Sequence, residues 1–287
     1  MGINTNNLMS LENPSKLYAI NGITLQLPSD HPIDFIKSRF KKYDEFLPFI
    51  VKRLSEGNGV VDVGANCGDT LATIIPHGVN LNYIAVEPSE TFFRYLIINL
   101  ETIRQLYPNT NIVINQSAIG SDSGLYDISE KNGTAKLIKS ANPTPRSFSK
   151  VKLKTLINSL DTNFKPRLIK IDTDGSDYDV LNSGLDLINE YKPILFFECC
   201  PFSGDQWMSY VETLRSLKQI NYKTFYVFDN FGDFILATSD MKIISSLIIY
   251  FANKPAQTPI YMDILAVAAA DVGLADAAIN EYNQTKF

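Results

Sequence analysis

The sequence is poor in cysteine, and its few cysteines form no pattern that could brace a fold. Only three occur in 287 residues: Cys67 lies in a glycine-rich turn, and Cys199 and Cys200 are adjacent. This spacing matches neither a disulfide framework nor a set of zinc ligands. We therefore expect a reduced, intracellular protein with the cytoplasm as its location, in which Cys199 and Cys200 are small buried residues.

The chain also lacks an excess of positive charge and any long apolar run. With 26 Lys plus Arg against 31 Asp plus Glu, its net charge of -5 gives no electrostatic reason to expect a nucleic acid as partner. The longest apolar run, residues 243–251, is interrupted by serines and is too short to span a bilayer. Residues 1–14 are polar and lack the pattern of a signal peptide. Neither nucleic acid nor membrane insertion is expected, and the oligomeric state stays open.

Histidine, the usual general base near neutral pH, occurs only twice. His31 precedes Pro32, and His77 follows Pro76. Both are predicted to be surface loop residues, with a role as general base as the lesser alternative.

Short apolar runs alternate with helical patterns from Gly59 onward. The first five runs are continuously apolar, as is typical of parallel strands buried on both faces, and their alternation with helices implies right-handed crossovers in a doubly wound sheet. The predicted strands are Gly59–Val63, 83–86, Asn111–Asn115, 168–171, 194–198, 224–228 and 262–267.

Two segments depart from this alternation. Residues 1–56 are predicted to form an N-terminal extension, with a strand at residues 23–27, a helix over residues 36–54 that is kinked or divided at Pro48, and a position suited to a lid. Residues 57–287 form the α/β domain. Within it, residues 120–150 are rich in Ser, Gly, Lys, Asn and Pro, which predicts hairpins and loops over one face.

The strongest local motif is a buried strand that runs into a glycine turn and then a helix. Asp62 ends the strand, the turn extends from Gly64 to Gly68, and Asp69 or Thr70 is the predicted N-cap. Glycine permits backbone angles closed to other residues, and amides at a helix start favour an anionic group. A dinucleotide fingerprint requires glycine at the positions of Asn66 and Asp69, so NAD and FAD are disfavoured. A tight turn without a ligand is the alternative.

Polar side chains also follow other predicted strands. Glu87 can accept two hydrogen bonds from a ribose diol, unless it is merely a solvated strand end. Ser117 and Ala118, after the third strand, would border an adenine in such a fold. Asp172 ends the fourth strand and is expected near Asp62, because ligands bind where the winding order of the sheet reverses. Together these positions predict a nucleoside site.

On these residues the chain resembles the FkbM-type family of class I S-adenosylmethionine-dependent methyltransferases, over residues 43–267. The family motif D-x-G-A-N-x-G is matched at residues 62–68, and its E-P motif is matched by Glu87 and Pro88. The hallmark similar to I-K-I-D-x-E-G-x-E-x-x-V-L is matched over residues 169–181. Asp174 and Asp177 stand there where the family usually has Glu, which keeps the charge and shortens the reach.

The resemblance implies an α/β fold, a doubly wound Rossmann-like seven-stranded methyltransferase sheet with its last strand antiparallel, preceded by the N-terminal strand and helix extension. It implies S-adenosyl-L-methionine as cofactor, with the glycine turn around its methionine part, Glu87 on the ribose, and Ser117 and Ala118 beside the adenine. The predicted cofactor-binding residues are Asp62, Gly64, Ala65, Asn66, Gly68, Thr70, Glu87, Pro88, Ser117, Ala118 and Asp172.

The predicted reaction is O-methylation of a hydroxyl on a sugar, glycan or related metabolite. Such a hydroxyl must lose a proton, and the candidate bases are Asp172, Asp174 and Glu198, all at or just past strand ends. Trp207 is the candidate for acceptor contact. A divalent metal held by Asp172 and Asp174 is the less favoured alternative, so no metal ligand is assigned. The competing function is a non-catalytic module that binds a nucleoside or S-adenosylmethionine.

Overall fold

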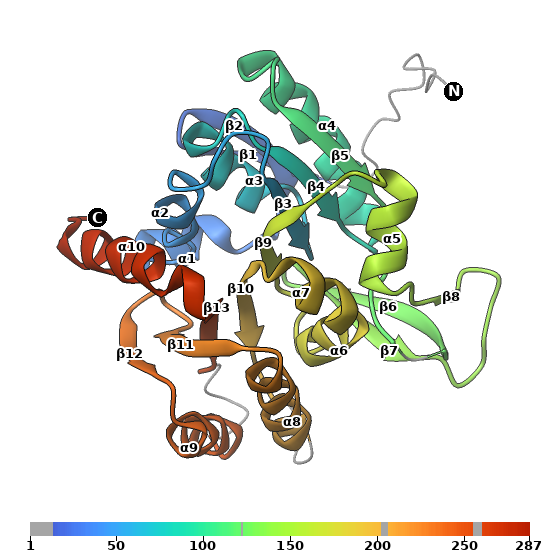
Figure 1. Cartoon of the computed structure of the whole chain (residues 1–287). Coiled ribbons are helices and arrows are strands. Elements are labelled where there is room, and N and C mark those ends of the chain that lie inside the picture. Colours follow the sequence, from blue (N-terminus) through green and yellow to red (C-terminus); the bar gives the residue numbers. More distant parts are fainter. Residues whose placement is uncertain (1–13, 122, 202–205, 255–259) are drawn as a thin grey trace.

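A computed structural model describes residues 14–121, 123–201, 206–254 and 260–287, and an eight-stranded sheet lies at its centre (Figure 1). The strand order is β12-β11-β13-β10-β9-β3-β4-β5. The strands are β3 (Gly59–Val63), β4 (Asn82–Val86), β5 (Asn111–Asn115), β9 (Pro166–Ile171), β10 (Ile194–Cys199), β11 (Tyr222–Asp229), β12 (Phe234–Thr238) and β13 (Met262–Ala268). Neighbours from β10 to β5 are parallel, and β13 is antiparallel to both β10 and β11.

The predicted fold class is confirmed, and all seven predicted strands are present. The sheet gains an eighth strand that the sequence pattern did not indicate, β12, which pairs antiparallel with β11 at the sheet edge. Its side chains are only half-buried or exposed, so it lacks the continuous apolar run of the inner strands. A turn at Asp229, whose carboxylate accepts the backbone N–H groups of Phe231 and Asp233, joins it to β11.

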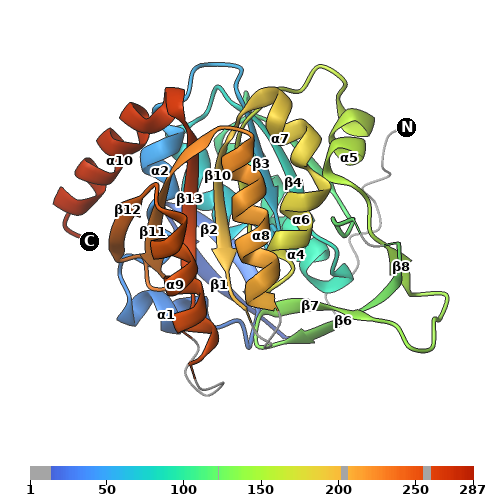
Figure 2. The ribbon, with the colours of Figure 1, turned by 60° about the horizontal axis from the view of Figure 1, so that its bottom comes forward.

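Helices cover both faces of the sheet, and each face has its own hydrophobic core (Figures 1 and 2). Successive strand residues point to opposite faces, so Val60 belongs to one core and Val61 to the other. One face carries α2 (Leu47–Val51), α3 (Asp69–Ile74), α4 (Glu90–Leu106) and α10 (Val272–Gln284). The other carries α5 (Leu153–Leu160), α6 (Asp177–Ser183), α7 (Leu185–Tyr191), α8 (Gln206–Gln219) and α9 (Met241–Ala252). Short 3-10 turns follow α3 at Ile75–His77 and precede α10 at Ala269–Asp271.

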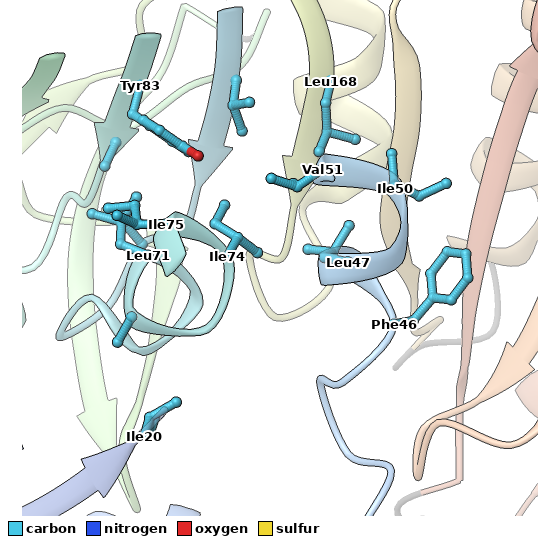
Figure 3. Close-up of a cluster of buried hydrophobic side chains, with 14 of the residues drawn as sticks. Ile20, Phe46, Leu47, Ile50, Val51, Leu71, Ile74, Ile75, Tyr83 and Leu168 are labelled. Atoms are coloured by element: carbon cyan, nitrogen blue, oxygen red, sulfur yellow. The ribbon is translucent and has the colours of Figure 1, made fainter. Parts of the chain in front are cut away.

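The N-terminal segment contributes directly to the first core. Figure 3 shows Leu47 and Val51 of α2 beside Ile74 of α3 and Leu168 of β9. Phe46 packs on Phe228, with ring centroids 4.6 Å apart. Burying side chains of this size stabilises a fold by about 1.5–3 kcal/mol each, so this packing fixes residues 46–51 against the sheet.

The elements before β3 include one strand more than predicted, and the predicted helix is divided. The predicted strand is β2 (Ile23–Pro28), and it forms a hairpin with β1 (Ser15–Ile20) through a two-residue turn in which Asn21 and Gly22 have positive φ. The predicted helix is divided into α1 (Ile33–Arg39) and α2, which confirms division in place of a kink, but the break lies at residues 40–46, before Pro48. Pro48 lies in the first turn of α2, where its missing N–H breaks no helical hydrogen bond. The domain boundary after residue 56 stays a prediction.

The predicted hairpins within residues 120–150 are confirmed. They form a separate small sheet in the order β7-β6-β8, made of β6 (Leu125–Lys131), β7 (Thr134–Lys139) and β8 (Phe148–Ser149). Gly133 in the tight β6–β7 turn has φ of +79°, and a Cβ there would lie 2.5 Å from Pro32 and 3.1 Å from the His31 ring. The hairpin turn therefore packs directly on the segment that leads into α1.

Across the described ranges, no helix combines the length and the apolar character that a bilayer crossing requires.

Candidate active site

A cavity lies at the carboxyl ends of β3, β4, β5, β9 and β10, bounded by the β6–β7 hairpin and by the segment around α1. Figure 2 shows the tip of β10 pointing toward the side of the molecule where α1, β6 and β7 lie. Nine of the predicted site residues line this cavity: Gly64, Asn66, Glu87, Pro88, Ser117, Ala118, Asp172, Asp174 and Glu198. Asp62, Ala65, Gly68 and Thr70 do not line it, and their predicted cofactor contacts stay predictions.

The glycine turn brings the ends of two neighbouring strands very close together. Gly64 has φ of +84°, and a Cβ there would lie 1.8 Å from the carbonyl oxygen of Asp172. Any larger residue would push β3 away from β9. Gly68, with φ of +90°, is the N-cap of α3, whereas the sequence pattern indicated Asp69 or Thr70. Asp69 is the first helical residue and lines the cavity.

Glu87 is buried at the tip of β4, which rules out a solvated strand end. Its Oε2 accepts the backbone N–H of Asn66 at 2.9 Å, and its Oε1 accepts that of Ser89 at 2.8 Å. Burial raises the pKa of Glu87 to about 7, although the two amides oppose this shift. Each carboxylate oxygen has a second lone pair, so the pair can also accept two hydroxyl groups from a vicinal diol.

Lys170 links the ends of β3 and β9. It lies opposite Asp62 in the parallel register, and its Nζ is 3.2 Å from Asp62 Oδ1 and 3.4 Å from Asp172 Oδ2. It also donates to the Gly64 carbonyl at 3.3 Å. Burial alone would lower the pKa of Lys170, but Asp62 and Asp172 raise it well above its usual value. The predicted proximity of Asp62 and Asp172 is confirmed, with a charged lysine between them.

The three candidate bases have different surroundings. The Asp172 side chain is 43% exposed, within the cavity. Asp174 has a positive φ, and burial followed by the charge of Asp172 raises its pKa to about 7, although the Ala135 backbone N–H binds its carboxylate. Burial and then Asp172 raise the pKa of Glu198 well above its usual value. Glu198 therefore favours its protonated form more than an exposed glutamate does, whereas the Asp172 side chain is partly exposed to the cavity.

Asp177 holds the turn between Asp172 and α6. Its carboxylate accepts the backbone N–H groups of Thr173 at 2.9 Å and Gly175 at 3.2 Å, and the hydroxyl of Tyr210 at 3.1 Å. The shorter aspartate side chain thus supports this turn from inside the second core.

The prediction that His31 is a surface loop residue is wrong. It is only 6% exposed, lines the cavity, and makes a side-chain hydrogen bond with Asn66. Burial lowers its pKa, so the imidazole is neutral near pH 7. His77 is exposed, as predicted. Tyr43, Asp44 and Tyr261 also line the cavity without having been predicted, because they reach it from segments far apart in the sequence.

Three further predictions concern Trp207, the cysteines and a metal. Trp207, the predicted acceptor contact, is not among the cavity-lining residues of the described chain and packs instead on the second core. Cys67, Cys199 and Cys200 are free thiols and buried. Within the described ranges, no group of three or more His, Cys, Asp or Glu side chains is arranged to hold a metal ion.

Comparisons with known proteins fit this architecture. The Methyltransferase FkbM domain matches residues 62–224. No curated protein sequence matches the chain. Similar solved structures include Methyltransferase FkbM from Methylobacillus flagellatus KT, at 17% identity and a TM-score of 0.43 over 74% of this chain and 44% of that one. The present chain thus spans less than half the length of that protein.

Two other similar structures are covered over most of their length. TYW2 of M. jannaschii in complex with AdoMet has 10% identity and a TM-score of 0.44, over 90% of this chain and 87% of that one. A SAM-dependent O-methyltransferase from Thermotoga maritima has 13% identity and a TM-score of 0.41, over 89% and 78%. Because the FkbM domain matches more than half of the sequence, the chain belongs to the FkbM methyltransferase family.

Proposed function

We propose that this chain binds S-adenosylmethionine and transfers its methyl group to a hydroxyl of a sugar, glycan or related metabolite. One observation carries the proposal: a single cavity joins Glu87 and the glycine turn to Asp172, Asp174 and Glu198. We call the ends of β3, β4 and β5 the cofactor half of this edge, and the ends of β9, β10 and β13 the acceptor half.

The residues of the cofactor half suit S-adenosylmethionine in shape and charge. Glu87 has lone pairs left for a ribose diol, and its position is fixed by two backbone amides. Among the residues that the structure describes, six carboxylates and one lysine line the cavity, which favours a ligand that carries positive charge. The carboxylates are Asp44, Asp69, Glu87, Asp172, Asp174 and Glu198. When bound, the cofactor supplies an electrophilic methyl group on a positively charged sulfur.

The acceptor half contains the proposed general base, Asp172, and the lysine that holds it in place, Lys170. Asp172 is exposed to the cavity and lies beside Lys170, which fixes its carboxylate relative to the Gly64 carbonyl. In this arrangement Asp172 takes the proton from the acceptor hydroxyl, and such general base catalysis contributes about 10²–10⁴-fold. The hairpin turn at Gly133 and the segment from His31 to Ile36 line the cavity and restrict entry of water.

A methyl-transfer assay on the full chain tests the proposal. We expect S-adenosylhomocysteine to form together with an acceptor that has gained one methyl group, when monosaccharides and glycans are supplied. NMR of the product should place the methyl group on oxygen. Transfer to nitrogen or carbon would contradict the predicted chemistry. Cofactor binding without any product across the acceptor panel would favour the non-catalytic module.

A further inference from the structure

We propose that the acceptor carries a protonated amine near its hydroxyl, and that a small second cavity in the acceptor half binds this amine. This inference rests on the proposed function and deepens it. The second cavity adjoins the first, because Asp44, Lys170, Asp172 and Glu198 line both.

The second cavity accepts only a small group. Its volume is about 30 Å³, against about 140 Å³ for the first. A cavity needs roughly 10–15 Å³ to hold one water molecule, so this one has room for an ammonium head and not for a sugar ring. An acceptor ring in the first cavity could therefore place one substituent into the second.

Carboxylates form one wall of this cavity. Glu198 of β10 lies directly opposite Asp263 of β13 in the antiparallel register, so the two side chains project from the same face of the sheet. Glu198 is only 5% exposed, and its Oε2 has no hydrogen-bond partner in the described part of the chain. A buried oxygen of this kind is costly unless a ligand supplies a donor.

The cations that line the second cavity are already engaged with other carboxylates. Lys170 lies between Asp62 and Asp172, and Lys42 Nζ is 2.8 Å from Asp233 Oδ1. Neither forms an ion pair with Glu198 among the described residues. The pocket is therefore suited to a cation that arrives with the ligand.

Aromatic rings lie beside these carboxylates, because Phe228 is opposite Asp263 in the antiparallel register and Phe196 is two residues before Glu198 on the same strand. Phe46, Phe196 and Phe228 line the second cavity, and their ring centroids lie 4.6–6.0 Å from one another. Aromatic faces attract organic cations, and the attraction grows when water is excluded. Neighbouring carboxylates and phenyl rings suit an alkylammonium group, whereas an anionic substituent would be repelled.

The pKa values of the carboxylates are also consistent with an ammonium group in the second cavity. Burial raises the pKa of Asp44 to about 7 and those of Glu198 and Asp263 well above their usual values. Asp172 and Asp174 after β9, Asp177 of α6 and Asp263 of β13 all face Glu198 and add to this shift. An ammonium group would favour their ionised forms and release protons on binding.

Calorimetric titration of the full chain with matched sugars tests the inference. The protein is first saturated with S-adenosylhomocysteine, which occupies the cofactor half, and is then titrated with glucosamine, N-acetylglucosamine and glucose. We expect glucosamine to bind at least tenfold more tightly than either neutral sugar. Asp263→Asn should remove this preference without changing the affinity for S-adenosylhomocysteine, since Asp263 lines only the second cavity. Asp186→Asn, on the exposed side of α7, is the matched control and should keep the preference.

The outcomes separate the two proposals. If S-adenosylhomocysteine does not bind, the proposed function fails and the inference fails with it. If it binds but the neutral sugars bind as well as glucosamine, or no sugar binds, the amine pocket is wrong while cofactor binding stands. A glucosamine preference that survives Asp263→Asn would also overturn the assignment of this pocket.

Discussion

The two halves of the carboxyl edge satisfy their charged groups in opposite ways. In the cofactor half, Glu87 is held by backbone amides on both oxygens, within a turn whose glycines fix the strand ends. In the acceptor half, burial together with neighbouring carboxylates raises the pKa values of Asp174, Glu198 and Asp263. Each half also holds a buried oxygen without a hydrogen-bond partner among the described residues, Asn115 Oδ1 at the end of β5 and Glu198 Oε2 on β10, so the halves differ in how their carboxylates are held. The experiments below separate the two halves.

The largest effect is expected in the acceptor half. Asp172→Asn removes the proposed base while keeping the size of the side chain, so turnover should fall about 10²–10⁴-fold. The affinity for S-adenosylhomocysteine should change much less, because Glu87 is untouched. Steady-state kinetics and calorimetry on the same preparation measure both. Asp186→Asn serves as control, and full retention of turnover in Asp172→Asn would show that this carboxylate is dispensable.

Lys170→Met should lower the free energy of unfolding by about 3–5 kcal/mol, because it leaves the buried Asp62 carboxylate without a counter-charge. Lys154→Met breaks the exposed ion pair with Glu190 and should lower the free energy of unfolding much less, because solvent screens this pair. Urea unfolding of both variants measures how much each substitution lowers the free energy of unfolding. Asp62→Asn in the Lys170→Met background should recover part of the loss. Equal costs for the two lysines would contradict the linking role of Lys170.

In the cofactor half, Glu87→Gln should weaken binding of S-adenosylhomocysteine by about 1.5–3 kcal/mol, the value of a hydrogen bond to a charged group. The matched control is Glu90→Gln, three residues along and exposed on α4, where its carboxylate pairs with Arg94. Calorimetry should show weaker binding of S-adenosylhomocysteine by Glu87→Gln and unchanged binding by Glu90→Gln. An unchanged affinity in Glu87→Gln would remove this residue from the cofactor site.

A pH dependence of stability is also expected. The pKa values of the buried Glu87 and Asp177 are both raised to about 7, so the folded protein binds more protons than the unfolded chain between about pH 4 and 7. Stability of the ligand-free protein should therefore fall as pH rises through this window, by up to about 1.4 kcal/mol per pH unit for each group, and then level off. Thermal unfolding between pH 5 and 8 measures the slope. Glu87→Gln should reduce it, and stability that rises with pH over this range would contradict the raised pKa values.

The cofactor half could be predicted from the sequence because its information is local. The strand, the glycine turn and the helix lie within residues 59–74, and Glu87 ends the next strand along the chain. The acceptor half depends on long-range contacts. Asp44 follows α1, Tyr261 precedes β13, and His31 reaches the cavity from beside the hairpin turn.

Lys170 is the exception among the residues that sequence analysis missed, because a local signal existed. It is a lone charge inside the apolar strand β9, and such a residue requires a partner on a neighbouring strand. Asp62 on β3 was already a site candidate, but the register that places the two opposite each other is a property of the assembled sheet. Trp207 was predicted to contact the acceptor because it lies near a strand end. An aromatic side chain at such a position can equally well pack into a core, as Trp207 does.

The most direct test of the account is calorimetric titration of the purified protein with S-adenosylmethionine, S-adenosylhomocysteine and NAD in parallel. We predict that the first two bind and NAD does not, because Asn66 and Asp69 stand where a dinucleotide turn has glycine. Absence of binding by the first two, or NAD binding as tightly as they do, would contradict the assignment of the cofactor half.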